Sequence, residues 1–296
     1  MLEHRLSRRM SDAQSAAEVF REAARLNRQD PLLRGAVLEF PDYGQLVMTG
    51  DLHGHRRNFA RLQRYCDLGQ FPVRHVILHE LIHEEPATLE EPDMSHLLLL
   101  EAARWKCEYP DQVHFLQSNH ELAQLTGHEI SKGGRIVNFD FENGVRRTYG
   151  PGAEDIEEVL RAIDDLLESY PLAGRTANRV FISHSLPGAR TMPDFDPGAL
   201  ARPITRDDLG RNGTAYALVW GRYQSEAHLE SLAKALDVDL FICGHQPQED
   251  GYAVVHDRLI ILASDHNHGV FLPFDLRREM TLSRLEGLIR PLAAIE

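Results

Sequence analysis

The 296-residue sequence is poor in cysteine and has no long hydrophobic run. Its three cysteines, Cys66, Cys107 and Cys243, are too few and too scattered for a disulfide framework or a thiolate zinc site, which indicates a reducing compartment. The longest apolar stretch lies around Leu97–Leu100 and stops at Glu101, so no segment is predicted to span a membrane. We therefore expect a cytoplasmic protein.

Positive charge is also scarce. The chain has 32 lysine and arginine residues against 45 aspartate and glutamate residues, which gives a formal net charge of −13. Contact with a nucleic-acid backbone or with an anionic membrane surface requires a basic face, so we expect neither partner. Hydrophobic residues make up 43% of the chain, which is ordinary for a globular protein. Histidine, in contrast, is abundant, with 16 copies.

Strand-like and helical segments alternate along most of the chain, and strands follow one another near its end. The clearest helical periodicity lies at Ile156–Tyr170. Other helices are predicted at Ser11–Asn27, Arg56–Leu68, Met94–Cys107 and Glu226–Leu236, and strands at Gln45–Thr49, His75–Leu78, Val113–Gln117, Val180–Ser183, Leu240–Cys243, Tyr252–His256, Arg258–Ala263 and Val270–Phe274. This order indicates a layered α/β sandwich with mixed sheets. We expect a helical extension over residues 1–35 and a single domain over residues 36–296.

Five of the predicted strands lead directly into residues that bind metals. These segments are Gly50-Asp51-Leu52-His53-Gly54-His55, His79-Glu80-Leu81-Ile82-His83-Glu84, Ser118-Asn119-His120-Glu121, His184 and Gly244-His245. Because ligand sites in α/β sheets lie beyond the carboxyl ends of strands, we expect the five segments to converge. Carboxylate, imidazole and amide groups together suit Mn, Fe or Zn better than Ca.

The spacing of these residues allows a pair of ions. Asp51 and His53 are separated by one residue and can reach the same ion. A carboxylate shared between two ions, here Glu80, would hold them about 3.5–4 Å apart, as in two-metal hydrolases. His120, which stands beside a ligand, would then be placed to protonate a leaving oxygen.

Taken in order, these motifs resemble those of the calcineurin-like metallophosphoesterases, and most closely the phosphoprotein phosphatase branch, which contains the serine/threonine phosphatases. The segments that carry the resemblance are Gly50-Asp51-Leu52-His53-Gly54, Ser118-Asn119-His120-Glu121, His184 and Gly244-His245. The stretches Asn58–Leu62, Tyr109–Asp111 and Glu249–Tyr252 also resemble segments of that family. The match covers roughly residues 45–275.

The resemblance implies a four-layer αββα sandwich of two mixed β-sheets flanked by helices, with a centre of two divalent ions (Mn, Fe or Zn). The ligands that it implies are Asp51, His53 and Glu80 for one ion, and Glu80, Asn119, His184 and His245 for the other. It assigns the general acid to His120. The implied activity is the hydrolysis of phosphomonoesters in a phosphorylated protein or small molecule.

The second motif departs from the family pattern Gly-Asp-x-x-Asp-Arg-Gly. The bridging Asp becomes Glu80, and the Asp that supports the catalytic histidine becomes His83. The phosphate-binding Arg becomes Glu84, which we expect to repel a phosphate dianion. Ser118 stands where the family usually has Gly. Metal binding is therefore better supported than fast phosphatase chemistry.

Three further residues are candidates for binding substrate. Arg206 and Arg222 lie in the segment where the family supplies another phosphate-binding arginine, and Arg222 is the preferred substitute. His268, in the penultimate loop, is a candidate for lining the pocket through a hydrogen bond rather than as a metal ligand.

Two alternatives remain open. His79-Glu80-Leu81-Ile82-His83 fits the His-Glu-x-x-His pattern of zinc metalloproteases, which requires a helix. A predicted strand runs straight into this segment, and Pro86 would break the required helix. The second alternative is a metal-binding phosphatase relative with weakened catalysis that acts by binding a partner, which the changes at His83 and Glu84 suggest.

Overall fold

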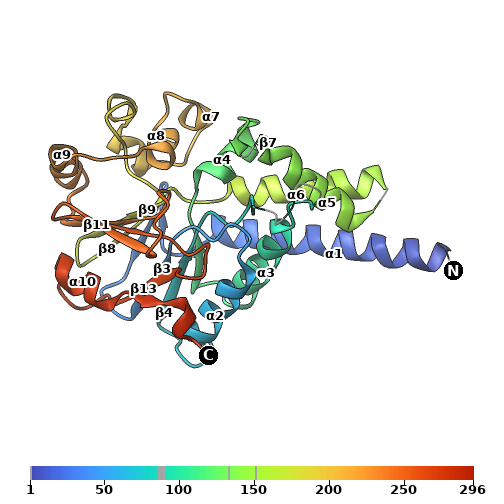
Figure 1. Cartoon of the computed structure of the whole chain (residues 1–296), viewed down its shortest axis with the longest axis horizontal. Coiled ribbons are helices and arrows are strands. Elements are labelled where there is room, and N and C mark those ends of the chain that lie inside the picture. The colour runs from blue at the N-terminus through green and yellow to red at the C-terminus, as the bar shows by residue number, and fades with distance from the viewer. Residues whose placement is uncertain (1, 86–87, 89–90, 133, 151) are drawn as a thin grey trace.

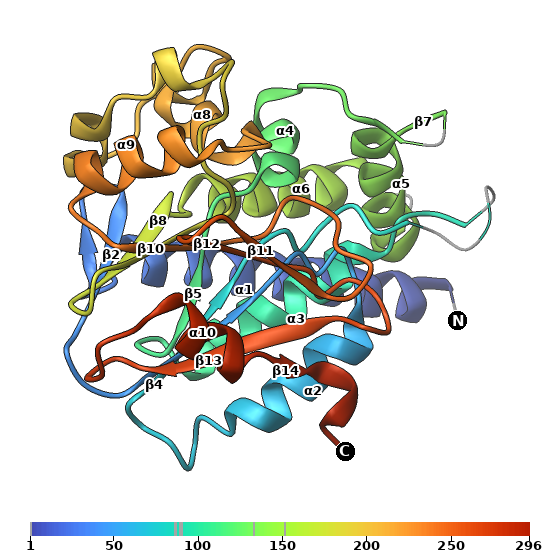
Figure 2. The ribbon, with the colours of Figure 1, turned by 60° about the vertical axis from the view of Figure 1, so that its left-hand side comes forward.

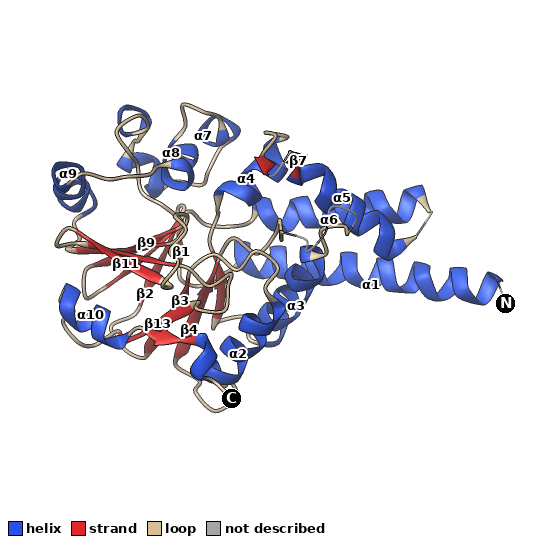
Figure 3. Cartoon of the chain, in the orientation of Figure 1, coloured by secondary structure: helices blue, strands red, loops and turns tan. Residues whose placement is uncertain are grey.

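A computed structural model describes residues 2–85, 88, 91–132, 134–150 and 152–296. It shows two large β-sheets with helices outside them, and Ser131–Lys132 and Arg135–Ile136 form a separate two-stranded sheet (Figures 1 and 3). Its helices are α1 (Leu2–Arg28), α2 (Arg56–Cys66), α3 (Ser95–Glu108), α4 (Asn119–Thr126), α5 (Val137–Tyr149), α6 (Ala153–Glu168), α7 (Arg206–Leu209), α8 (Thr214–Trp220), α9 (Glu226–Leu236) and α10 (Leu282–Leu288), with 3-10 turns η1 (Met192–Asp194), η2 (Pro197–Ala201) and η3 (Leu292–Ala294). Its strands are β1 (Leu33–Arg34), β2 (Val37–Phe40), β3 (Gln45–Thr49), β4 (Arg74–Leu78), β5 (Val113–Phe115), β6 (Ser131–Lys132), β7 (Arg135–Ile136), β8 (Ala173–Thr176), β9 (Val180–Ser183), β10 (Leu240–Cys243), β11 (Tyr252–Val255), β12 (Leu259–Leu262), β13 (Val270–Asp275) and β14 (Arg290–Pro291).

Both large sheets are mixed, as the predicted fold class requires. The seven-stranded sheet has the order β1-β2-β8-β9-β10-β12-β11, and the five-stranded sheet has the order β14-β13-β3-β4-β5. Strands β9, β10 and β12 run parallel in the first, and β3, β4 and β5 run parallel in the second. In each sheet, the carboxyl ends of three neighbouring parallel strands therefore lie at the same end of the sheet. The predicted α/β sandwich of two mixed sheets flanked by helices is confirmed.

Neighbouring side chains of one strand point to opposite faces of its sheet and so enter different hydrophobic cores. In β3, Leu46 and Met48 enter the core between the two sheets, whereas Val47 enters the core shared with the outer helices. In β10, Ile242 lies between the sheets and Phe241 packs in the core on the opposite face. Because both faces are buried, these strands appear in the sequence as continuous hydrophobic runs rather than as alternating ones. That property made them predictable.

The outer helices cover the two sheets on opposite sides. Leu218 of α8 and Leu229 of α9 share a core with the seven-stranded sheet. Phe20 of α1 and Ile163 of α6 share another with the five-stranded sheet. Figures 1 and 2 both show α1 beside α6, along which it packs. None of the helices in the described ranges is both long and apolar enough to cross a membrane.

All of the predicted helices and strands are present, and four have the predicted bounds: β3, β9, β10 and α9. The first helix begins at Leu2, earlier than the predicted Ser11. Helix α5 has no counterpart among the predicted helices, and it contains Gly144. A Cβ at this glycine would lie 1.7 Å from Asp93 O, so the close approach of the Asp93 backbone requires glycine there.

A buried polar cluster joins the end of α1 to the five-stranded sheet. Asp30 Oδ2 accepts hydrogen bonds from Lys106 Nζ at 3.1 Å and His114 Nδ1 at 2.8 Å. His114 Nε2 lies 3.1 Å from His75 Nδ1 on the neighbouring strand. Lys106 also donates to Pro110 O at 2.7 Å. In this cluster the fully buried ammonium group of Lys106 pairs with the carboxylate of Asp30.

Candidate metal centre

The carboxyl ends of the parallel strands meet where the two sheets approach each other. Asp51, just after β3, forms an isolated parallel bridge with Ala263, just after β12. The loops are also tied together within one sheet, because Leu52 N and His53 N both donate to Glu80 O, at 2.9 and 2.8 Å. The convergence expected from the sequence is therefore present.

Several residues in these loops have left-handed backbone conformations. The φ angles are 39° at His53, 50° at Glu80, 62° at His83 and 69° at His245. Such conformations cost non-glycine residues on the order of 1–3 kcal/mol each and collect at functional sites. The close packing around position 244 favours glycine, because a Cβ there would lie 2.3 Å from Asp51 Oδ1.

Potential metal-ligand atoms of four side chains lie close together at the strand ends. His184 Nε2 lies 2.7 Å from Asn119 Oδ1, 3.1 Å from His245 Nδ1 and 3.4 Å from Glu80 Oε2. His245 Nδ1 lies 2.8 Å from Asn119 Oδ1. These four residues are the ligands that the resemblance implies for one of the two ions.

The other carboxylate oxygen of Glu80 faces a second set of residues. Glu80 Oε1 lies 3.6 Å from His53 Nε2 and 3.5 Å from His120 Nε2. Asp51 Oδ1 lies 3.6 Å from both His79 Nδ1 and His184 Nδ1. Within the described residues, potential ligand atoms therefore form two close groups, Asp51–His79–His184 and His53–Glu80–His120.

The chemistry of these groups fits divalent cations. Glu80 Oε2 is buried and has no hydrogen-bond donor among the described residues, although it lies close to His184 Nε2. Burial raises the pKa of Asp51 to about 7 and the pKa of Glu80 well above its usual value. Burial also lowers the pKa of His245 to about 3, which keeps its ring neutral, as a metal ligand requires. Cations here would stabilise both carboxylates in the charged form.

His79 stands where the family has glycine, and it contacts a predicted ligand. Its Nε2 lies 2.9 Å from Thr49 O, so this nitrogen must carry the proton. Its Nδ1, 2.9 Å from His184 Nδ1, therefore accepts the proton of that nitrogen. The His184 Nε2 lone pair is thereby directed toward the cluster. Burial lowers the pKa of His79 to about 4, which keeps this arrangement neutral at pH 7.

We expect His79 to position His184 for metal binding. His79→Leu removes both hydrogen bonds, so affinity for Mn²⁺ should fall about 10–100-fold, the usual effect of losing a partner that orients a ligand. His79→Gln can still donate to Thr49 O and accept from His184, and should bind within about threefold of the native protein. Titration calorimetry measures both affinities. Equal, native-like affinities in the two variants would contradict this role.

His83 contacts His120 in place of the carboxylate that the family uses. Its Nδ1 lies 2.8 Å from His120 Nδ1, and its Nε2 lies 3.1 Å from Gln124 Oε1. With the proton on His83 Nε2 donated to Gln124, His83 Nδ1 accepts from His120 Nδ1–H. His120 is thereby oriented with its Nε2 toward Glu80. A neutral imidazole supplies this orientation without the negative charge of an aspartate.

The other two departures from the family pattern have local structural explanations. Glu84 Oε1 accepts a hydrogen bond from Met94 N at 2.5 Å, at the start of α3, and Glu84 is not among the residues that line the site pocket. The expected repulsion of phosphate by Glu84 is therefore weaker than its sequence position suggested. Ser118 is the N-cap of α4, and its hydroxyl donates to Glu121, whose other oxygen accepts from Leu81 N at 2.7 Å.

The pocket at the cluster has a volume of about 200 Å³ and brings together most of the predicted site residues. The sequence-predicted residues that line it are Asp51, His53, Glu80, Asn119, His120, Arg222 and His245. His184 is fully buried behind them. Arg206 and His268 are exposed and do not line this pocket.

Two charged lining residues were not predicted from the sequence. Lys132, from the β6–β7 hairpin, and Asp265, after β12, both face this pocket. Arg222 reaches it through a hydrogen bond from its Nε to His245 Nε2 at 3.0 Å. The position of Lys132 at this pocket could not be predicted, because the sequence around it has no hydrophobic periodicity.

The metalloprotease pattern does not form the helix that it needs. Residues 79–85 are not helical, and both Glu80 and His83 have positive φ. The two histidines therefore do not share a helix face. Pro86, which was predicted to break that helix, lies outside the described residues. The protease alternative is rejected on the conformation of residues 79–85 alone.

Two stacked mixed sheets with a cluster of carboxylate, imidazole and amide side chains at their strand ends match the metallophosphoesterase fold. Residues 45–249 match the family model described as calcineurin-like phosphoesterase, and the chain belongs to this family.

Three individual proteins are similar to this chain, one in sequence and two in fold. The chain is 22% identical over 224 residues to a Caenorhabditis elegans serine/threonine-protein phosphatase, C23G10.1, covering 71% of this chain but only 44% of that relative. A Saccharomyces cerevisiae protein serine/threonine phosphatase with similarity to human phosphatase PP5 has a similar fold, with a TM-score of 0.65 and 15% identity over 95% of this chain and 93% of that one. A cold-active protein-tyrosine phosphatase of a psychrophilic Shewanella species has a TM-score of 0.53 and 16% identity over 86% of this chain and 82% of that one.

Proposed function

We propose that this protein is a two-metal-dependent phosphoester hydrolase, a phosphatase of phosphoprotein-phosphatase type that acts on phosphomonoesters. The observation that carries the proposal is the buried Glu80 carboxylate. Its Oε1 faces His53 and His120, and its Oε2 faces His184 Nε2, which lies close to Asn119 and His245. The residues that would hold the ions are Asp51, His53 and Glu80 for one, and Glu80, Asn119, His184 and His245 for the other. Two divalent ions would polarise the phosphoryl group and activate water for attack.

His120 is the proton donor in this proposal. Its Nδ1–H is held by His83, so its Nε2, which faces the pocket, is the nitrogen that can carry and release a second proton. In the reaction it would donate this proton to the departing oxygen. The neutral partner His83 stabilises the imidazolium less than a carboxylate would, so we expect modest rates.

Arg222 and Lys132 supply positive charge for the phosphate. Both line the pocket, one from the loop after α8 and the other from β6. Metal binding at His245 Nδ1 would leave the proton of that ring on Nε2, which then no longer accepts from Arg222. The guanidinium would thereby become available to phosphate oxygens, which it can bind in a bidentate manner.

The experiment that tests the proposal compares the Mn²⁺-reconstituted native protein with His120→Asn. We expect His120→Asn to lower kcat for hydrolysis of para-nitrophenyl phosphate about 10²–10⁴-fold, the usual contribution of general acid catalysis. Metal content should be unchanged, because His120 is not a proposed ligand. His256→Asn, an exposed histidine with positive φ that asparagine tolerates, is the matched control and should keep native activity.

The neutral His83 favours one other function, that of a metal-binding relative with weakened catalysis that acts by binding a partner. The same experiment separates the two. Equal, near-zero rates for the native protein and His120→Asn, with both ions bound, would support the binding protein and contradict the hydrolase.

A further inference from the structure

A second pocket adjoins the candidate metal centre at Arg222. It has a volume of about 720 Å³ and is built from the loop after β9, the segment before α8, α8 itself and the loop after it. Arg222 lines both this pocket and the metal-site pocket, so the two spaces meet at its side chain. A volume of this size accommodates a small organic molecule. The leaving group of a substrate bound at the metal centre therefore has an adjacent space.

Arginine side chains collect around this second pocket. Arg190, Arg211 and Arg222 line it together with one carboxylate, Asp194. Within the described part of the chain, none of the three arginines forms an ion pair with a carboxylate; Arg211 contacts His128 Nδ1 at 3.4 Å. In a chain with a net charge of −13, such a group of arginines indicates a site for an anion.

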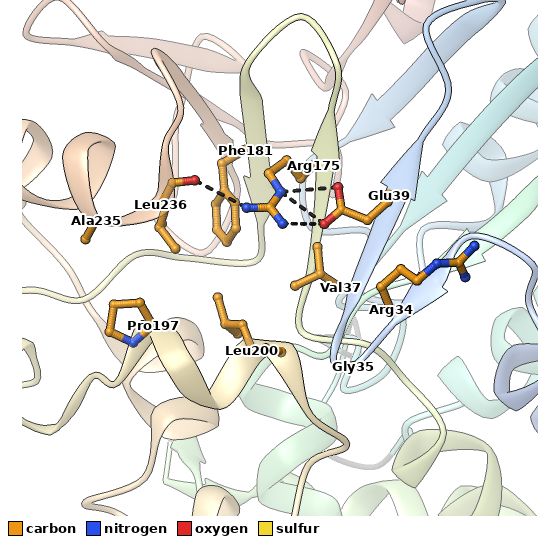
Figure 4. Close-up of a pocket in the computed structure, with 11 residues that line it drawn as sticks. Arg34, Gly35, Val37, Glu39, Arg175, Phe181, Pro197, Leu200, Ala235 and Leu236 are labelled. Carbon is orange, nitrogen blue, oxygen red and sulfur yellow. Dashed lines mark hydrogen bonds and ion pairs between the residues drawn. The ribbon is translucent and has the colours of Figure 1, made fainter.

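Another pocket in the protein shows the contrast. In a pocket of about 420 Å³ lined by β2 and β8, the guanidinium of Arg175 is paired with the carboxylate of Glu39 and also contacts Leu236 O (Figure 4). That arginine is already neutralised by a protein carboxylate and serves the fold. Among the residues that the structure describes, no carboxylate pairs in this way with the arginines of the pocket beside the metal centre.

The same pocket contains an aromatic surface. The rings of Tyr216 and Trp220, both on α8, are stacked with centroids 5.7 Å apart and an interplanar angle of 28°. The Trp220 ring lies edge-on to His245, 6.3 Å away, which places the aromatic pair next to a proposed metal ligand. Exposed Tyr223 also lines the pocket. Stacked aromatic side chains with adjacent arginines bind flat, anionic ligands such as nucleotides.

We propose that this pocket binds the leaving group of a nucleoside polyphosphate whose terminal phosphoryl group occupies the metal centre; this assignment rests on the proposed function. The base stacks on Tyr216 and Trp220, and the remaining phosphates bind Arg190, Arg211 and Arg222. The oxygen of water bonds to the terminal phosphorus as the water releases a proton to solvent, and the bond from that phosphorus to the bridging oxygen breaks. His120 gives its proton to the departing oxygen, so that inorganic phosphate and the shortened nucleotide are released.

This ligand class accounts for both the arginines and the aromatic rings that line the pocket. The leaving group of a phosphoserine or phosphothreonine substrate has no aromatic ring to stack on α8. A phosphotyrosine side chain has the ring but carries no anionic group beyond the phosphate at the metal centre. A nucleoside polyphosphate has both the flat ring and the additional negative charges.

The test compares ATP, phosphotyrosine and para-nitrophenyl phosphate as substrates of the Mn²⁺-loaded protein. The variant Arg190→Gln/Arg211→Gln should lower the ratio of kcat/KM for ATP to that for para-nitrophenyl phosphate about tenfold or more, because hydrogen bonds to charged groups are lost. Arg147→Gln/Arg277→Gln makes the same charge change at two exposed arginines outside the pocket and should leave the ratio unchanged. An unchanged ratio in the pocket variant, or a preference for phosphotyrosine that does not depend on these arginines, would overturn the proposal.

A binding measurement separates this proposal from the proposed function. N-methylanthraniloyl-ATP should bind Mn²⁺-loaded His120→Asn and should bind about tenfold more weakly when Arg190→Gln and Arg211→Gln are added. If nucleotide binding depends on the arginines but the Mn²⁺-loaded native protein releases no phosphate, the pocket assignment is supported and the hydrolase is rejected. Hydrolysis of para-nitrophenyl phosphate without arginine-dependent nucleotide binding would reject the pocket assignment alone.

Discussion

Glu80→Gln should lower hydrolysis of para-nitrophenyl phosphate by about 10³-fold, equivalent to about 4 kcal/mol of lost transition-state stabilisation. The reason is that Glu80 is the residue whose two carboxylate oxygens face both groups of potential ligands. An amide carries no negative charge, so the content of bound Mn²⁺ should fall together with activity. Metal analysis of the purified variant, alongside an initial-rate assay, measures both effects.

The matched control lies four residues further along the same motif. Glu84→Gln makes the same chemical change, but Glu84 hydrogen-bonds to Met94 N and does not line the metal-site pocket, so metal content and activity should remain near native values. Glu80→Asp, which restores the family residue, should retain both ions and equal or exceed native activity. Full metal content in Glu80→Gln would contradict the bridging role.

Asp30→Asn should destabilise the protein by about 3–5 kcal/mol, the usual cost of removing one partner of a buried ion pair. Lys106 is fully buried, and Asp30 is the carboxylate with which it pairs. The amide would leave the ammonium without its counter-ion, and it would also weaken the hydrogen bond from His114. Urea denaturation followed by circular dichroism measures the change in the free energy of unfolding.

Asp165→Asn is the control for this prediction. Asp165 also holds α1, through Arg28 at 2.7 Å, but this pair is exposed and should contribute at most about 1 kcal/mol. Adding Lys106→Met to Asp30→Asn should recover part of the lost stability, because the unpaired charge is then absent. Equal destabilisation by Asp30→Asn and Asp165→Asn would contradict the account of the buried cluster.

The Asp30 cluster also gives stability a defined dependence on pH. Burial raises the pKa of Asp30, but the hydrogen bond and charge of His114 and the charge of Lys106 outweigh it, so the pKa lies below its usual value. The folded state therefore binds fewer protons at this carboxyl than the unfolded state does. Its stabilising contribution is fully present above about pH 4 and is lost as the pH falls further. In Asp30→Asn this part of the acid dependence should disappear.

The strands and the ligand segments could be predicted because local sequence determines both. Strands such as β3 and β10 are continuous apolar runs, and each ends in a short polar motif whose position follows from the parallel sheet. The roles of His79 and Lys132 could not be predicted in the same way. His79 contacts His184 more than 100 positions away in the sequence, and Lys132 reaches the pocket through a two-stranded hairpin with no hydrophobic pattern.

Glu84 shows the opposite limitation. Its position in the motif predicted repulsion of phosphate, yet its side chain turns to the backbone of Met94 at the start of α3. A motif indicates which residue stands at a position, but rotation about the side-chain bonds determines what that residue contacts. The contact made by Ser118 could likewise not be read from its position in the motif. Its hydroxyl caps α4, where the family usually has glycine.

The central claim, that two metal ions at the Glu80 cluster support phosphoester hydrolysis, is tested most directly by metal analysis and phosphate release on one sample. The protein is stripped with a chelator, reconstituted with Mn²⁺ and assayed with para-nitrophenyl phosphate before and after each step. We expect about two ions per chain and a rate that is lost on chelation and restored on reconstitution. Two bound ions without phosphate release above the blank, or a rate that survives chelation, would contradict the account.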